Sequence, residues 1–140
     1  MNLIILIQCG KLQKDGCHQA KDLYISPIFK ANWKEAESEY PDAEKYIISS
    51  GHGFLKPNKI VCKYDTAFPD KEEDLDKWAR QVVASILKTG FDPKKEKLII
   101  YASKRVGLAI VRCFPILKEY LIISRGWYGQ KSVISGTKPI

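Results

Sequence analysis

The stretch 46–53 has the residue types of a binding site at the end of a strand. It reads Tyr-Ile-Ile-Ser-Ser-Gly-His-Gly, a buried strand that stops at a small polar turn with His52 between two glycines. Ligands of open parallel sheets sit at the carboxyl ends of the strands. We therefore expect His52 to act as a general acid or base there. The alternative is a structural turn with an incidental histidine. The turn residues predicted to bind a ligand are Ser49, Ser50 and Gly51.

Small residues, hydroxyls and cations follow all four predicted strands. Small residues let backbone amides approach a bound anion, and hydroxyls and cations are suited to bind phosphate or carboxylate. Lys104 and Arg105 occupy the first turn of a predicted helix, where cations oppose the helix dipole. A bound anion would relieve that conflict, whereas the simpler alternative is two solvated side chains. The strand-end residues added to the predicted ligand site are Cys9, Gly10, Lys11, Lys104 and Arg105.

Two carboxylates lie close to tyrosines in predicted loops, Asp22 near Tyr24 and Asp65 beside Tyr64. A carboxylate can position water or stabilise positive charge on a sugar, and a tyrosine ring can stack on a base. We predict that Asp22 and Asp65 are catalytic together with His52, and that Tyr24 and Tyr64 bind the ligand. In the structural alternative Asp22 caps backbone amides and Tyr24 packs on the sheet.

The four cysteines form no CxxC pair. Free thiols are the default in a cytoplasmic chain, so we predict thiols at Cys9, Cys17, Cys62 and Cys113. A nucleophilic role for Cys9, beside Lys11, is an alternative to simple burial. The cysteines and histidines have no recognised metal-ligand spacing, and the chain has no P-loop or dinucleotide fingerprint. We therefore predict no metal and no cofactor.

The bulk composition predicts one domain over residues 1–140 and an anionic partner. Lys and Arg number 23 against 16 Asp and Glu, which gives a net charge of +7. This excess favours a nucleic acid or nucleotide, although a merely solvated basic surface would have the same charge. The apolar start of the chain is shorter than the about 20 residues of a membrane span and has no signal-peptide features. We expect no membrane partner and a cytoplasmic location.

Hydrophobic periodicity predicts alternating strands and helices. A continuous aliphatic run at 2–8 is typical of a strand covered on both faces. Such an alternation predicts an α/β fold, a three-layer sandwich with a mostly parallel central sheet. The predicted strands are 2–8, 45–49, 97–102 and 119–124, and the predicted helices are 27–40, 70–89 and 103–114. Residues 13–21 are expected to form a loop, 59–64 a short extended piece, and the tail from Arg125 is left unassigned.

Four segments together resemble a known family. They are the first strand with the Cys-Gly-Lys that follows it at 9–11, Lys-Asp-Leu-Tyr-Ile-Ser-Pro-Ile-Phe at 21–29, the turn at 46–53, and Tyr-Asp-Thr at 64–66. The first half of the chain thereby resembles small uncharacterised domains related to the YaaA peroxide-stress proteins and to a domain of archaeosine-type tRNA transglycosylases. The resemblance implies a uracil-DNA-glycosylase-like fold and a link to nucleobases. The pocket residues that it implies are Cys9, Gly10, Lys11, Asp22, Tyr24, Ser26, Ser49, His52, Tyr64 and Asp65.

Three functions are compatible with these patterns. The first is an enzyme acting on a nucleobase, nucleoside or nucleotide at its N-glycosidic bond. The second is a basic nucleic-acid-binding module without chemistry, whose affinity falls steeply with salt. The third is a subunit of a larger nucleic-acid modification system, with a protein partner.

Overall fold

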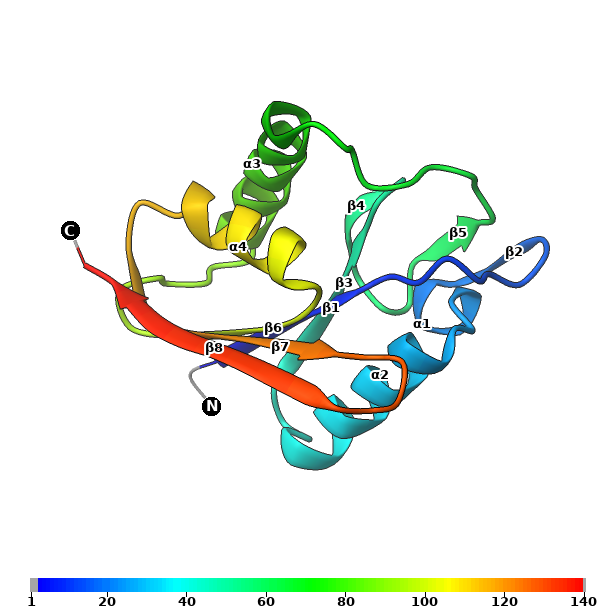
Figure 1. Cartoon of the computed structure of the whole chain (residues 1–140), viewed down its shortest axis with the longest axis horizontal. Helices are drawn as coiled ribbons and strands as arrows, with labels where there is room; N and C mark the ends of the chain where they lie inside the picture. Colours follow the sequence, from blue (N-terminus) through cyan, green and yellow to red (C-terminus); the bar gives the residue numbers. More distant parts are fainter. Residues whose placement is uncertain (1–2, 140) are drawn as a thin grey trace.

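A six-stranded sheet lies at the centre of the computed structural model, which describes residues 3–139 (Figure 1). Its strand order is β4-β3-β1-β6-β7-β8. The four inner strands are parallel, and the two edge strands run antiparallel to their neighbours. The inner strands are β3 (Glu44–Ser49), β1 (Leu3–Gln8), β6 (Lys97–Tyr101) and β7 (Leu117–Arg125), and the edges are β4 (Gly53–Leu55) and β8 (Lys131–Lys138). The prediction of a mostly parallel central sheet is confirmed; Asn2, predicted in the first strand, lies outside the described residues.

Helices cover both faces of this sheet. The helices α1 (Ala20–Leu23) and α2 (Pro27–Glu39) lie on one face, and α3 (Glu72–Lys88) and α4 (Lys104–Cys113) on the other (Figure 1). The aliphatic run in β1 requires this double cover, since Ile5, Leu6 and Ile7 are fully buried. The three long helices match the predicted ones to within two residues at each end.

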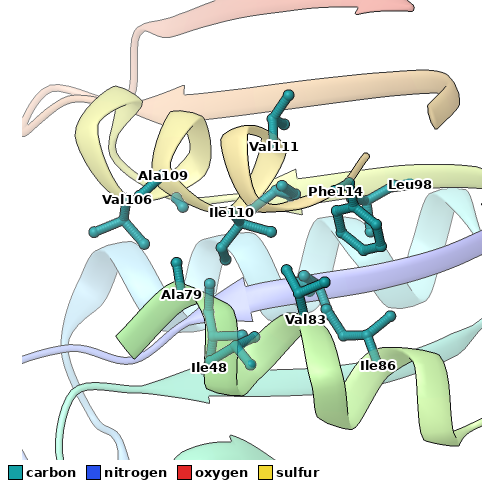
Figure 2. Packing of buried hydrophobic residues seen from close by; sticks show 14 of the residues in the cluster. Ile48, Ala79, Val83, Ile86, Leu98, Val106, Ala109, Ile110, Val111 and Phe114 are labelled. Carbon is teal, nitrogen blue, oxygen red and sulfur yellow. The ribbon is translucent and has the colours of Figure 1, made fainter. Parts of the chain in front are cut away.

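The larger core cluster lies between the sheet and the pair α3 and α4. Figure 2 shows Ala79 and Val83 of α3 facing Ile110 of α4, with Ile48 and Leu98 of the sheet beside them. Helical spacing places these apolar residues on one stripe of each helix. The start of α4 is fixed by Ser103, whose Oγ accepts a hydrogen bond from the Val106 backbone N–H at 3.3 Å.

A second, two-stranded sheet interrupts the predicted loop. In it β2 (Cys17–Gln19) pairs antiparallel with β5 (Ile60–Cys62), so that Cys17 lies directly opposite Cys62. The two cysteines form a disulfide across 45 residues of sequence. The prediction of thiols is therefore wrong for this pair, because the register of two short strands, which spacing does not reveal, brings them together. Cys9 and Cys113 are free.

The unassigned tail forms the outer strand of a hairpin. β7 turns back into β8 through Gly126–Gly129, where Gly129 has a φ of +81° that favours glycine. Two aromatic side chains stand at the tip, Trp127 with 88% and Tyr128 with 96% of its surface exposed. The hairpin thus places a tryptophan beyond the carboxyl end of β7.

The strand order creates a switch point between β1 and β6. The chain leaves β1 toward α2 on one face, and it leaves β6 toward α4 on the opposite face. A crevice opens where adjacent parallel strands send their connections to opposite sides, and ligands bind there in open α/β sheets. None of the helices in residues 3–139 has the length and apolar character to cross a membrane.

Candidate functional site

A largely apolar cavity of about 430 Å³ occupies the switch point. This volume falls in the range of about 300–1,000 Å³ found for small-molecule pockets. Phe29 of α2 and Trp127 of the hairpin supply aromatic wall, and Lys11 and Arg125 are its cationic lining residues. The remaining lining residues are Gln8, Cys9, Gly10, Leu12, Ser26, Pro27, Ile28, Asn32, Ala102, Ser103 and Ser124. We refer to it as the apolar cavity.

A second cavity of about 230 Å³ adjoins the first. The segment Gln8, Cys9, Gly10 and Lys11 lines both, so the loop after β1 forms the partition between them. Apolar atoms still make up more than half of the lining of this second cavity, but its polar share is larger than that of the first cavity and Asp65 supplies a carboxylate, so we refer to it as the polar cavity. Its other lining residues are Gln13, Ser50, Tyr64, Thr66, Ala67 and Phe68. The two cavities therefore place an aromatic-walled space beside a carboxylate, with Lys11 at their junction.

A hydrogen-bond network of hydroxyls lies behind the polar cavity. The Tyr24 hydroxyl donates to Ser49 Oγ at 2.9 Å, and the Tyr64 hydroxyl lies 2.7 Å from the same oxygen. Ser49 Oγ also accepts a bond from the His52 backbone N–H at 3.0 Å. Tyr64 Oη in turn donates to Cys9 Sγ at 3.6 Å. This network connects the ends of β1 and β3 to the loops that carry both tyrosines.

The network keeps its tyrosines protonated. Burial raises the pKa of Tyr24 well above its ordinary value, and burial likewise raises the pKa of Tyr64. A phenol whose pKa is raised retains its proton at neutral pH and remains a hydrogen-bond donor. Both hydroxyls therefore serve to position Ser49 and Cys9, rather than to supply negative charge to the cavity.

Two glycines of the predicted site are required by close packing. A Cβ on Gly10 would overlap Ser26 Oγ and lie 2.8 Å from Ser26 Cβ. A Cβ on Gly51 would overlap the Tyr64 ring. The absence of a side chain at these positions lets the β1 loop approach α2 and lets Tyr64 pack over the turn after β3.

Most of the predicted site residues come together at the crevice. Cys9, Gly10 and Lys11 line both cavities, Ser26 lines the apolar one, and Ser50, Tyr64 and Asp65 line the polar one. Tyr24 and Ser49 are buried behind them, and Gly51 packs against Tyr64. This convergence follows from the parallel sheet, which brings the carboxyl ends of its strands to one edge.

Two of the predicted catalytic residues are placed elsewhere. The His52 ring is exposed, packs edge-on against Tyr64 and lies with Nε2 3.3 Å from the Cys62 carbonyl oxygen. Asp22 lines a separate hollow beside α1 and α2. Neither residue lines the apolar or the polar cavity. The antiparallel β3–β4 turn carries His52 past the end of β3, and this is why the strand-end argument misplaces its side chain.

The two predicted phosphate ligands of α4 also lie outside both cavities. The side chain of Arg105 binds the α3 terminus instead: it pairs with Glu72 at 3.1 Å and donates to the backbone carbonyls of Pro69 and Asp70. Lys104 is exposed to solvent. The positive charge of Arg105 therefore joins the start of α4 to the start of α3.

The structure adds residues that the sequence reasoning did not select. Arg125 Nε donates to Asn32 Oδ1 at 2.9 Å, and its terminal nitrogen pairs with Glu35 at 2.9 Å, which joins β7 to α2. Glu35 also pairs with Lys131. Burial by itself would raise the pKa of Glu35, but its hydrogen bonds from Lys131 and Arg125 hold that pKa below its ordinary value. The sequence contained a signal for Arg125, because this residue follows a predicted strand. The sequence pattern gave no comparable signal for Asn32 or Trp127.

No group of three or more His, Cys, Asp or Glu side chains in the described part of the chain is arranged to hold a metal ion. The ionisable lining residues of the two cavities are instead Lys11, Arg125 and Asp65, together with Cys9 and Tyr64. Such a set can bind an anion and can move a proton at one carboxylate.

Fold and site define the general class as an α/β sandwich with paired cavities at the strand ends. Residues 4–115 match a protein family of unknown function, DUF6884, and the chain belongs to this family. The chain is 36% identical over 75 residues to the uncharacterized protein YfjM of Bacillus subtilis (strain 168), an alignment covering 49% of each protein. The chain thus spans about half the length of this curated relative. No solved structure matches the chain significantly.

The predicted relationship to a small uncharacterised family is therefore confirmed at that level. The matches reported above include neither a YaaA peroxide-stress protein nor an archaeosine-type transglycosylase. That finer link stays a prediction.

Proposed function

We propose that the crevice binds a nucleobase, nucleoside or nucleotide and acts at its N-glycosidic bond. The observation that carries this proposal is the pairing of the two cavities across the loop 9–11. An aromatic-walled apolar space suits a planar base, and the adjoining polar space suits a sugar. Lys11 stands where both meet and suits a phosphate. A mostly parallel sheet covered on both faces also supports the uracil-DNA-glycosylase-like fold that we include in the proposal.

In this proposal each side chain acts where the structure places it. The base lies against Phe29 and under Trp127 in the apolar cavity, which Arg125 also lines. Asp65 in the polar cavity accepts the proton of an attacking water. The water oxygen bonds to the anomeric carbon as the carbon–nitrogen bond breaks, and the electron pair of that bond leaves with the base. The base takes up a proton from solvent water and Asp65 later releases its own proton to solvent, so that one water is consumed overall. Neither His52 nor Asp22 has a role here, because their side chains line neither cavity.

The location of the protein in the cell is also part of this proposal. We keep the predicted cytoplasmic location, where the exposed disulfide between Cys17 and Cys62 would meet reducing conditions. The site itself contains the free Cys9 and would not be altered directly by reduction.

A thermal-shift screen of nucleobases, nucleosides and nucleotides tests the binding. A ligand at about 100 times its dissociation constant adds about 2.7 kcal/mol to the free energy of unfolding. We expect stabilisation that Trp127→Ala weakens and that Tyr128→Ala does not, since Tyr128 is equally exposed but lines neither cavity. Equal effects of the two substitutions, or no stabilising compound, would reject the crevice as a base-binding site.

Turnover is tested separately with Asp65→Asn. This substitution keeps a side chain of the same shape and removes the carboxylate that accepts the proton. We expect Asp65→Asn to retain binding in the thermal shift and to lose base release by at least about 100-fold, the lower end of acid–base contributions. Full base release by Asp65→Asn would leave a binding site without this chemistry.

A further inference from the structure

The positive charge of the chain is concentrated in two segments. Residues 10–34 and 55–64 contain eight lysines and two aspartates, with no arginine or glutamate. The rest of the chain contains 15 basic and 14 acidic residues and is nearly neutral. The excess charge therefore belongs to these segments rather than to the surface as a whole.

The fold brings the two segments together at one end of the molecule. Figure 1 shows β2, α1 and β5 gathered beyond the carboxyl end of β1, with the start of α2 next to them. Backbone bonds join the segments, from Ala20 N–H to the Lys59 carbonyl at 2.8 Å and from Lys21 N–H to the Pro57 carbonyl at 2.9 Å. The disulfide between β2 and β5 joins them as well.

Most of these lysines lack an internal partner. Lys63 pairs with Asp15 at 2.9 Å, and both side chains are well exposed. The other seven have no carboxylate within ion-pairing distance anywhere in residues 3–139. They are all exposed: Lys11, Lys14, Lys21, Lys30, Lys34, Lys56 and Lys59. Like charges gathered in this way raise the local potential and attract polyanions.

A hollow with an aromatic wall lies inside this charged region. It measures about 290 Å³, and Lys14, Lys21 and Lys30 line it together with Trp33. Its other lining residues are Asp22, Tyr24, Ile25 and Phe29. The Trp33 ring is half-buried and stacks on Phe29, with centroids 6.1 Å apart and an interplanar angle of 19°. The ring is therefore held in place while part of it remains open to the hollow.

We propose that this region, which we name the lysine surface, binds single-stranded nucleic acid. The lysines contact backbone phosphates, and one unpaired base enters the hollow against Trp33. A duplex keeps its bases paired and stacked and offers none to a hollow. A flat bilayer contacts residues that project from the surface and does not reach an aromatic ring inside a hollow. The hollow adjoins the crevice and shares Phe29 with it, and Lys11 belongs to both regions. The residues tested below, Lys14, Lys21, Lys30 and Trp33, line neither crevice cavity, so the inference does not require that the crevice bind a nucleotide.

The first test measures fluorescence anisotropy of a labelled 12-nucleotide single strand against increasing salt. With five phosphate contacts we expect log K to fall with log[salt] at a slope of about −3.5. The same strand in a duplex should bind more weakly. Duplex binding as tight as single-strand binding would overturn the proposal. So would tighter binding to vesicles of 30% phosphatidylserine in phosphatidylcholine.

Matched triple variants locate the surface. Lys14→Gln/Lys21→Gln/Lys30→Gln removes three charges at the hollow, and Lys71→Gln/Lys77→Gln/Lys88→Gln removes three exposed, unpaired charges outside it, on and beside α3. We expect the first to weaken binding at least about 10-fold and to reduce the salt slope by about 2, and the second to do neither. Equal losses in both would mean that net charge alone attracts the polymer, which overturns the assignment.

Trp33→Leu tests the base in the hollow. Loss of one stacked base should weaken single-strand binding about 5- to 150-fold and leave the salt slope unchanged. A second variant, Trp33→Phe, keeps an aromatic ring and should restore much of the affinity. An unchanged melting temperature shows that each variant is folded; unchanged affinity in a folded Trp33→Leu protein would overturn the role of the hollow.

Discussion

The Tyr24 hydroxyl donates a hydrogen bond to Ser49 Oγ at 2.9 Å and thereby joins the segment before α2 to the last residue of β3. Both residues are almost completely buried, and Tyr64 and the His52 backbone complete the same network. The bond crosses between two chain segments that the sheet does not itself connect. Its loss should therefore affect the shape of the crevice as well as the stability of the fold.

Tyr24→Phe removes this hydroxyl and keeps the ring. We expect the free energy of unfolding to fall by about 1–2 kcal/mol, because the hydrogen bonds of this hydroxyl to Ser49 and to the Tyr64 hydroxyl are lost, while both of those residues retain other partners. Urea unfolding followed by circular dichroism measures the difference. Tyr128→Phe is the control, since its hydroxyl is at an exposed hairpin tip and its removal should change nothing measurable. A loss as large for Tyr128→Phe would contradict the role of the network.

High pH should destabilise the protein through its buried tyrosines. Burial and the bond to Glu44 raise the pKa of Tyr46 to about 12, whereas an unfolded tyrosine has a pKa of about 10. Below pH 10 both states keep the proton and the contribution to stability is complete. Between pH 10 and 12 the unfolded state loses the proton first, so stability falls as the pH rises. Denaturant unfolding at stepwise pH should show this loss, and Tyr46→Phe should reduce it.

Gly10→Ala should disturb the crevice from within. The new Cβ would meet both Ser26 Oγ and Ser26 Cβ, so the β1 loop or the start of α2 must move. We expect a loss of about 1–3 kcal/mol in the free energy of unfolding, the usual cost of overpacking. The double variant Gly10→Ala/Ser26→Gly removes the obstructing atoms and should recover most of the stability. A double variant no better than the single one would place the strain elsewhere.

Arg105 and Lys104 should differ sharply although they are adjacent. Arg105→Ala breaks the ion pair with Glu72 and the bonds to two carbonyls before α3, so we expect a loss of about 1–2 kcal/mol in unfolding free energy. Lys104→Ala removes an exposed side chain and should change stability by less than about 0.5 kcal/mol. Chemical denaturation of both variants compares them directly. Equal losses would contradict the role of Arg105 in joining the two helices and would leave it available for its predicted role as an anion ligand.

Thiol counting checks the disulfide. In denaturant without reductant a thiol reagent should modify Cys9 and Cys113, and after reduction all four cysteines should react. The loop of about 45 residues implies a stabilisation of up to about 4 kcal/mol by chain entropy. Reduced protein should therefore melt at a lower temperature. Four reactive thiols in protein purified without reductant would show that the pair is open in solution.

Sequence reasoning succeeded where local patterns determine the structure. The aliphatic run of β1 determines a strand, and the N-cap Ser103 and the proline at the first position of α2 determine where two helices begin. The parallel arrangement then brings Cys9, Ser50 and Tyr64 to one edge. It could not place residues whose positions depend on pairing between distant segments. The β2–β5 register, the β4 turn that carries His52 away, and the β8 hairpin that raises Trp127 all depend on such pairing.

Phe29 lines the apolar cavity on one side and the hollow of the lysine surface on the other. The apolar cavity and the hollow are thus adjacent and are separated by the chain segment between Tyr24 and Phe29. A ligand in one space that moves this segment changes the shape of the other space, and thermodynamic linkage makes the effect on the two binding affinities reciprocal. Binding of a nucleic-acid strand to the lysine surface and binding of a base in the crevice would then be energetically coupled through the Phe29 ring.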